Sequence, residues 1–331
     1  MGYPGLPDGK FQYKIKRNMT NQSDTIYIIG NGAIGRALAV FLRLAGQCPV
    51  LVRGSVLKTG SRNERIRVET VEGEVREANI GIATLDAFGS LDGPVVLATK
   101  SYGNERLSRL LRDKIGDSPL VLLQNGLGVE RPFLERGFPQ LYRAVLFVTS
   151  QPMHDGTIRF RLVEASPVGT ERGTDSGQAG IVSRLHTPDF AFRGEADIRP
   201  VIWRKAIVNC VFNSVCPLLE ADNGLLHRNV EARVLARRII AECTAVAVAK
   251  GISIREEEVE ESLLRISRSS EGQFISTLQD IRSHRPVEMD SLNFEIVRVA
   301  QSLGLGDRVL ETRLLGELTA LKAELARETL N

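Results

Sequence analysis

The stretch Thr25–Arg53, which reads TIYIIGNGAIGRALAVFLRLAGQCPVLVR, constrains the fold of this chain more than any other. It opens with the short apolar run Ile26–Ile29, typical of a strand buried on both faces of a parallel sheet. Glycines at positions 30, 32 and 35 then have the spacing G-x-G-x-x-G. In this pattern the first glycine permits a tight turn, the second lets the backbone approach a pyrophosphate, and the third lets a helix pack on the strand.

A helical pattern follows these glycines directly. Apolar residues recur at helical spacing from Ile34 to Leu42, and Gly46 provides a stop signal. The N-terminus of this helix would face the phosphates, where unpaired N–H groups and the helix dipole attract anions. The sequence therefore predicts a dinucleotide-binding turn, with cofactor contacts from Gly30, Asn31, Gly32, Ala33, Ile34 and Gly35.

The next predicted strand, Pro49–Val52, is followed by Arg53. Near this position, proteins that prefer NAD usually carry an acid that binds the 2′-hydroxyl of the adenosine ribose. A guanidinium followed by the small residues Gly54 and Ser55 can instead bind a 2′-phosphate through two hydrogen bonds. We therefore expect NADP(H) as the cofactor, with Arg53 as a contact. The alternative is a solvated arginine at the end of a strand.

Composition argues against several other classes of protein. The 43 Lys and Arg residues oppose 40 Asp and Glu residues, and the formal charge of +3 is spread without a dominant basic block, so charge gives no reason to propose a nucleic-acid partner. Without a run of about 18 apolar residues or a signal-peptide core, we expect a cytoplasmic protein that makes no membrane contact. Four cysteines without C-x-x-C spacing and four scattered histidines predict no sequence-local metal site.

The pattern along the chain predicts an N-terminal extension before the folded part. Residues 1–24 mix glycine, proline, lysine and polar residues without periodicity, so we expect a disordered or loosely attached tail. Met19 stands close before the first strand, which suggests the hypothesis that translation naturally starts there. Further strands are predicted at Pro94–Thr99, Leu120–Leu123, Ala144–Val148 and Thr157–Val163, the last alternating as in a hairpin or edge strand.

Beyond residue 196, long helical patterns replace the strand signals, over residues 198–219, 230–250, 256–268, 273–282, 289–303 and 308–328. The predicted fold is therefore α/β: a Rossmann-type doubly wound, mostly parallel sheet in an NADP-binding domain (25–196), followed by an all-helical substrate and catalytic domain (197–331). Such an arrangement leaves a cleft between the domains, a common place for a second ligand. Lys100 and Asn125 follow two central strands, at the sheet edge where ligands bind.

In the predicted helix 198–219, three polar residues follow at intervals of four: Lys205, Asn209 and Asn213. This spacing places them in one slowly drifting stripe on a single helix face. Their neighbours are apolar, so the helix is largely buried and the stripe needs polar partners. It either lines a wet cleft or serves helix packing through side-chain hydrogen bonds.

Taken in order, these features resemble the sequence blocks of the ketopantoate reductase (2-dehydropantoate 2-reductase) family, from Ile26 to about Leu321. Any one block is weak evidence, but the ordered set is more specific. Besides the glycine turn, the set comprises Arg53, Lys100, QNGLG at Gln124–Gly128, K-x-x-x-N-x-x-x-N from Lys205, DNG at Asp222–Gly224, and STLQD and VEMD within Ser276–Asp290.

The resemblance implies NADPH-dependent reduction of ketopantoate to pantoate, a step toward pantothenate and coenzyme A. Lys205 matches the family's proton-donating lysine, which stabilises and then protonates the oxygen left by hydride transfer. Glu288 matches an acid near the nicotinamide ribose and the lysine, where it could keep Lys205 protonated. Lys100 and Asn125 match cofactor contacts near the nicotinamide. The implied substrate contacts are Lys205, Asn209, Asn213, Asn223 and Ser276, the last holding the carboxylate.

Several of these residues also have purely structural interpretations. Asn125 and Asn223 suit turns before glycine, and Glu288 suits the first turn of a helix. The sequence also departs from the family pattern around the substrate pocket, where Thr277 stands in place of a common methionine and Phe294 in place of a frequent glycine. Substrate identity is therefore less constrained than cofactor or reaction type.

Two further hypotheses about function follow. One is reduction of another branched 2-oxo acid, because the scaffold alone does not fix the substrate. The other is a non-catalytic NADPH-sensing protein, which would have no need of a proton donor. We expect a small-molecule 2-oxo acid as the partner of this chain. The apolar pattern Val309–Leu325 either completes the second domain or forms a homodimer contact.

Overall fold

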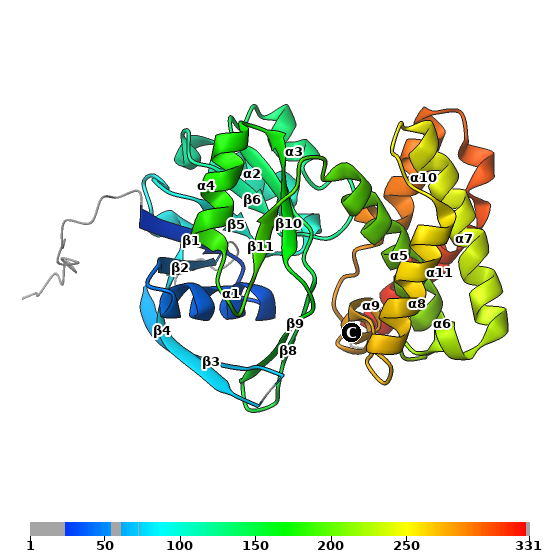
Figure 1. The fold of residues 1–331 in the computed structure, drawn as a ribbon, viewed down its shortest axis with the longest axis horizontal. Coiled ribbons are helices and arrows are strands. Elements are labelled where there is room, and N and C mark those ends of the chain that lie inside the picture. Colours follow the sequence, from blue (N-terminus) through cyan, green and yellow to red (C-terminus); the bar gives the residue numbers. More distant parts are fainter. Residues whose placement is uncertain (1–23, 54–60, 72, 329–331) are drawn as a thin grey trace, which may run out of the picture.

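The computed structural model describes residues 24–53, 61–71 and 73–328. Within these residues eleven strands form one sheet, in the order β11-β10-β7-β6-β5-β1-β2-β4-β3-β9-β8. Figure 1 shows the sheet and its helices on one side of the molecule and a group of helices that starts with α5 on the other. The strands are β1 (Thr25–Ile29), β2 (Cys48–Arg53), β3 (Arg62–Glu69), β4 (Val75–Thr84), β5 (Val95–Leu97), β6 (Leu120–Leu122), β7 (Leu141–Ala144), β8 (Val148–Pro152), β9 (Ile158–Leu162), β10 (Ser166–Arg172) and β11 (Phe192–Gly194).

The centre of the sheet consists of mutually parallel strands in the order β4-β2-β1-β5-β6-β7. If these six strands are numbered 1 to 6 in chain order, they lie in the sheet in the order 3-2-1-4-5-6, which is that of a doubly wound dinucleotide-binding fold. That order reverses between β1 and β5, and folds of this kind bind ligands outside the carboxyl ends of the strands at the reversal. The predicted fold class is confirmed.

Side chains of β1 are buried on both faces of the sheet. Ile26 and Ile28 belong to a core with α1 (Ala33–Leu44) and α4 (Asp175–Leu185). Tyr27 and Ile29 belong to the opposite core, with α2 (Asn104–Ile115) and residues around α3 (Arg131–Glu135). Burial on both faces is the reason that this strand is apolar throughout.

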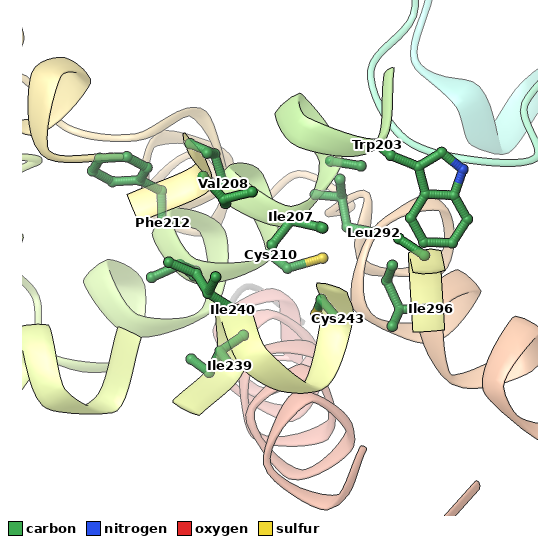
Figure 2. Close-up of a cluster of buried hydrophobic side chains, with 14 of the residues drawn as sticks. Trp203, Ile207, Val208, Cys210, Phe212, Ile239, Ile240, Cys243, Leu292 and Ile296 are labelled. Carbon is green, nitrogen blue, oxygen red and sulfur yellow. The ribbon is translucent and has the colours of Figure 1, made fainter. Parts of the chain in front are cut away.

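The helix α5 (Arg199–Leu218) is central to the C-terminal half. Figure 2 shows Trp203, Ile207 and Cys210 of α5 in one buried cluster with side chains of α7 and α10. Burying one such aliphatic or aromatic side chain contributes about 1.5–3 kcal/mol, so the cluster holds α5 firmly. The other helices of this half are α6 (Leu225–Arg228), α7 (Val230–Ala249), α8 (Glu256–Ser269), α9 (Ser276–Arg282), the 3₁₀ turn η4 (Met289–Ser291), α10 (Asn293–Ser302), the 3₁₀ turn η5 (Gly306–Arg308) and α11 (Leu310–Glu328).

The predicted strand at Ala144–Val148 is wrong. β7 ends at Ala144 and β8 begins at Val148, and residues 145–147 connect strands that lie far apart in the sheet order. The connection is fixed by hydrogen bonds from the Val145 N–H to the Pro167 carbonyl and from the Phe147 N–H to the Ser166 hydroxyl. Its residues are apolar because Val145 and Leu146 are buried, and an apolar run indicates burial rather than strand conformation.

The predicted helix 289–303 is interrupted. Leu292, with φ −113° and ψ −105°, separates η4 from α10, so the backbone turns just after Glu288 and Ser291. Helix α9 begins at Ser276, three residues later than its pattern suggested. Most of the predicted N-terminal extension, with Met19, lies outside the described residues. Within the described ranges, no helix is long and apolar enough to cross a membrane.

Candidate active site

The glycine turn between β1 and α1 has the geometry that a pyrophosphate requires. A Cβ at Gly30, where φ is +133°, would lie 2.7 Å from the Ala98 carbonyl carbon, and one at Gly35 would lie 2.1 Å from the Gly30 oxygen. At Gly32, in contrast, no atom of the described residues lies within 4 Å of such a Cβ. The first and third glycines are thus required by close backbone contacts, and the second borders open space at the N-terminus of α1.

That helix N-terminus is suited to an anion. Gly32 is its N-cap; in the part of the chain that the structure describes, no side chain caps the first turn, which also has no acidic residue. The leading N–H groups and the positive end of the helix dipole are therefore left for a ligand. Asn31 is tied to Arg36, whose guanidinium also pairs with Glu64 at 2.6 Å. The residues present fit a dinucleotide phosphate.

Arg53 is the last residue of β2, adjacent to β1 at its carboxyl end. Its side chain is half-buried, and its Nε is buried without a hydrogen-bond partner among the described residues. A buried guanidinium nitrogen is costly unless it is paired, so Arg53 carries an unsatisfied donor at this edge of the sheet. Gly54 and Ser55, predicted to leave room beside it, lie outside the described residues.

The cation Lys100, which follows β5, binds two carboxylates of the helical half. Its Nζ lies 2.9 Å from Asp280 Oδ2 of α9 and 2.9 Å from Glu288 Oε2. Burial opposes its charge, but the two carboxylates outweigh this effect and raise the pKa of Lys100. The other oxygen of Glu288 accepts from the N–H and hydroxyl of Ser101, at 3.0 and 3.1 Å. These contacts join the two halves beside the β1/β5 reversal.

The turn after β6 presents Asn125. Gly126 has a φ of +97°, and a Cβ there would lie 2.4 Å from the Ser291 oxygen, so only glycine permits this close contact with η4. The Leu127 N–H donates to the same oxygen at 2.7 Å. Gln124 is fixed by reciprocal amide bonds with Asn104, at 2.7 and 2.8 Å. The Asn125 side chain is left exposed at the edge of the sheet.

Lys205 lies in a small pocket of about 10 Å³ between this turn and α5. The pocket is lined by residues 124–126 and 143–145 of the sheet half and by Ile202, Lys205 and Ala206 of α5. The Lys205 ammonium donates to the Leu146 carbonyl and lies 5.6 Å from the centre of the Phe147 ring. Burial, followed by the positive charge of Arg143, lowers the pKa of Lys205 to about 8. The lysine is thus poised to exchange a proton near neutral pH.

The two asparagines of the α5 stripe have different environments. Asn213 is 4 % exposed; its Nδ2 donates to the Asn209 carbonyl at 3.0 Å and its Oδ1 accepts from the Thr277 hydroxyl at 2.7 Å. Asn209, one turn closer to Lys205, is only partly buried. The stripe therefore contacts the helix α9 at Asn213 and is partly exposed at Asn209. Helix packing through a side-chain hydrogen bond holds for Asn213, and a wet cleft at Asn209 stays a prediction.

The remaining predicted residues lie at the start of α6 and α9. Asn223 is 6 % exposed, and its Nδ2 donates to the Ser270 hydroxyl at 3.2 Å while its Oδ1 is buried without a partner in the described part of the chain. Ser276 is exposed at the first position of α9. Neither contributes to the pocket around Lys205. Their predicted contacts with substrate stay predictions.

Both halves of the chain match models of one family. Residues 26–169 match the model described as ketopantoate reductase PanE/ApbA, and residues 197–315 match the model of its C-terminal part. The chain belongs to the ketopantoate reductase family. Relatives named 2-dehydropantoate 2-reductase are 26 % identical over 285 residues in Mycobacterium tuberculosis and 28 % identical over 284 residues in Pyrobaculum aerophilum. Each alignment covers 85 % of this chain and 92 % of the relative.

Solved structures share the fold across nearly the whole chain. A dimeric ketopantoate reductase from Staphylococcus aureus superposes with a TM-score of 0.75 at 19 % identity, covering 91 % of this chain and 99 % of that one. A D-mandelate dehydrogenase bound to NADH and anilino(oxo)acetate gives a TM-score of 0.78 at 23 % identity, with the same coverage. The chain is therefore an oxidoreductase of the ketopantoate reductase family, and its cofactor is a nicotinamide dinucleotide.

Three residues around this candidate site were not singled out from the sequence: Arg143, Thr277 as a partner of Asn213, and Asp280. Ser101 was expected only as a polar residue beside Lys100 at the ligand-binding edge of the sheet. Of the three, Arg143 has the clearest signal, because a charge inside the apolar segment LYRAVLF must be paired if it is buried. Glu288 binds Lys100 and Ser101, and the charge that acts on Lys205 is that of Arg143. These contacts give no support to the expectation that Glu288 keeps Lys205 protonated.

Proposed function

We propose that this chain reduces ketopantoate to pantoate with NADPH, in the pathway toward pantothenate and coenzyme A. The observation that carries the proposal is the Lys205 ammonium in the pocket between the Gln124–Gly126 turn and α5, with a pKa near 8. When bound, the nicotinamide supplies hydride to the ketone carbon. The protein then has to bind the oxo acid, stabilise negative charge on its oxygen and deliver one proton.

Lys205 performs the last two tasks in this proposal. As the ketone carbon gains hydride, its C=O double bond becomes a C–O⁻ single bond, and the ammonium stabilises that charge. Lys205 then transfers a proton from Nζ to the oxygen, which leaves pantoate and a neutral amine that solvent reprotonates. A lysine with a pKa of about 8 is mostly protonated at neutral pH yet releases its proton more readily than an exposed lysine.

The other predicted residues have binding roles. Asn209 would bind the substrate one helical turn from Lys205, and Asn213 would do so after exchanging its bond with Thr277. Asn223, whose Oδ1 has no partner among the described residues, and Ser276 would contact the far end of the substrate. For the cofactor, the glycine turn would hold the pyrophosphate and Arg53 the 2′-phosphate of NADP(H). Lys100, Asn125 and Glu288 would flank the nicotinamide end.

One observation favours a second candidate, the reduction of another branched 2-oxo acid. The Thr277 hydroxyl occupies the Oδ1 of Asn213, so this predicted substrate contact is already satisfied in the structure. An asparagine whose oxygen already accepts a hydroxyl offers different hydrogen-bonding groups from a free one, and such differences can discriminate strongly between substrates.

An assay of NADPH oxidation separates these candidates. With ketopantoate and a panel of aliphatic and aromatic 2-oxo acids, we expect kcat/KM to be highest for ketopantoate. Activity confined to another oxo acid would move the assignment to the second candidate. Tight NADPH binding without turnover of any oxo acid would contradict an enzyme and favour the sensing hypothesis.

The proposal includes a cytoplasmic location and a homodimer. The four cysteines are free thiols, as expected where disulfides are rare. The homodimer is supported by α11, whose leucines 310, 314, 318, 321 and 325 are each 42–57 % exposed. Their spacing places them on one helix face, in a stripe of about 22 Å. A continuous apolar stripe is unusual on a monomer.

A second copy of this chain suits the stripe because its flanking charges are self-complementary. If two α11 helices pair antiparallel about residues 317 and 318, Leu310 faces Leu325 of the other copy. Glu311 then lies near Lys322 of the other copy on one flank, and Arg313 near Glu324 on the other. Within the chain Glu311 also pairs with Arg238 and Lys322 with Glu220, so contacts across the dimer would extend these pairs. Opposite charges beside an apolar seam select orientation and partner.

Light scattering during size-exclusion chromatography tests this contact. We expect the wild-type mass to be twice 36.4 kDa, and the paired change Leu314→Glu with Leu321→Glu to give a monomer. Both leucines are at least half exposed, so the fold should persist. Val163→Glu, at a site 57 % exposed in the sheet half, is the matched control and should leave the dimer intact. A wild-type monomer at micromolar concentration would overturn the proposal.

A further inference from the structure

Arg143 is an arginine in the interior of the protein. It lies near the end of β7 and is 2 % exposed, although arginine is rarely buried unless it is paired. One nitrogen, Nη1, pairs with the Glu130 carboxylate. The other, Nη2, donates to the Gly126 carbonyl at 2.9 Å and, more weakly, to the Gln124 carbonyl at 3.4 Å. Nε is buried and has no partner among the described residues.

These bonds act on the turn that presents Asn125. The carbonyls of Gln124 and Gly126 flank this residue, and one guanidinium nitrogen binds both. Gly126 also needs a φ of +97° and packs on Ser291, so the turn adopts a backbone conformation that few sequences favour. A planar, rigid donor group is well suited to fix two carbonyl groups at once.

The same side chain lines the pocket of Lys205. Both residues contribute to its wall, from β7 and α5 respectively. Two cations that share a partly desolvated pocket repel each other, and the repulsion weakens if one of them is paired with a carboxylate. Glu130 provides that carboxylate, so the field at Lys205 depends on the balance between Arg143 and Glu130.

We propose that Arg143 is a positioning residue for ketone reduction: it fixes the turn that presents Asn125 and, together with Glu130, sets the electrostatic environment of the Lys205 ammonium. This inference rests on the proposed role of Lys205 as proton donor. It assigns Arg143 no contact with substrate. The Glu130–Arg143 pair is instead the part of the protein that adjusts the proton affinity of the donor.

The other charged groups differ in their partners. Glu171, on β10, has its pKa raised by burial and then by Glu130, with Arg143 opposing, so it interacts with the same pair. On α5 and just before it, Arg199 pairs with Asp197, and Arg204 pairs with Glu258. Lys100 is bound to Asp280 and Glu288. Of these groups, Arg143 is the one whose charge lowers the pKa of Lys205.

Charge removal on either side of the pair gives opposite expected results. In the wild type, kcat/KM should fall as pH rises through about 8, because Lys205 loses the proton that it must donate. Arg143→Met removes a repelling cation and exposes Lys205 to Glu130, so this fall should move up by about 1 pH unit. Glu130→Gln leaves Arg143 unneutralised, so the fall should move to lower pH.

The rate at which acetic anhydride acylates Lys205 at different pH values reports the same pKa independently of activity. Mass spectrometry on the protein without cofactor follows this reaction. The pH dependence of acylation should shift as the activity profile does, and in the double variant Arg143→Met, Glu130→Gln it should return toward that of the wild type. Arg136→Met, which removes a cation paired with Glu105, is the control and should shift neither profile.

Each outcome is decisive. Shifts of opposite sign in the two single variants support the inference, since a purely structural role for Arg143 would not reverse the shift. Shifts of the same sign, or none, overturn it. If Arg143→Met does not fold, Glu130→Gln and the double variant still give the sign. Unchanged turnover in Lys205→Met would refute the proposed function itself, a result distinct from an unshifted acylation profile.

Discussion

Replacing Lys205 by methionine should lower kcat by about 10²- to 10⁴-fold, the usual effect of losing a positioned general acid. Methionine keeps most of the volume of the stem but has no proton to donate and no charge to stabilise the developing alkoxide. The NADPH dissociation constant should change little, because the residues proposed to bind the phosphates lie at the glycine turn and β2. Stopped-flow measurement of NADPH oxidation with saturating ketopantoate gives the rate of the chemical step.

Two further variants sharpen this test. Lys205→Arg keeps the positive charge but does not release a proton near neutral pH, so its rate should stay low if proton transfer matters as well as charge. Lys250→Met removes an exposed lysine just after α7 in the same half of the protein and should leave kcat within about two-fold. A Lys205→Met enzyme within a few-fold of wild type would exclude Lys205 as the donor.

The parts of the site that the sequence predicted are those that depend on local geometry. The glycine turn depends on residues within one strand–turn–helix unit, and its first and third glycines have the close backbone contacts that their spacing implies. The line of Lys205, Asn209 and Asn213 depends only on the helical repeat, and α5 is helical throughout this segment.

The parts that the sequence did not predict are contacts between distant segments. Lys100 and Asp280 are 180 positions apart, and Thr277 and Asn213 are 64 apart. No periodicity within one helix or strand reports which carboxylate meets which cation across two halves of a protein. The same reason applies to Glu288, which matched an acid near Lys205 by family resemblance but binds Lys100 and Ser101 in the structure.

The apolar segment around Leu146 illustrates a different limit. Its sequence resembles a strand, yet it crosses from β7 to β8 and provides the carbonyl that accepts from Lys205. Continuous apolar character follows from burial, and both strands and buried connections satisfy it. A connection that is irregular can direct a carbonyl toward a side chain, whereas in a central strand that carbonyl would bind a neighbouring strand.

Replacing Arg53 by alanine should weaken NADPH binding by about ten- to hundred-fold, and NADH binding by much less. A hydrogen bond to a charged group contributes about 1.5–3 kcal/mol, which corresponds to a factor of this size in the dissociation constant. NADH has a 2′-hydroxyl where NADPH has a phosphate, so the guanidinium has little charge to meet in the NADH complex. Isothermal titration with each reduced cofactor, without substrate, measures both constants.

The position of Arg53 makes the comparison specific. It ends β2 beside β1, and the structure leaves its Nε buried without a partner among the described residues, so alanine removes a donor rather than an existing ion pair. Arg62→Ala is the matched control, because Arg62 is exposed on the neighbouring part of the sheet and already pairs with Glu64 at 2.7 Å. If the wild type binds NADPH and NADH equally, or if Arg53→Ala weakens both alike, the 2′-phosphate is not what Arg53 recognises. The cofactor assignment would then revert to a nicotinamide dinucleotide without preference, since the glycine turn holds only the pyrophosphate that both forms share.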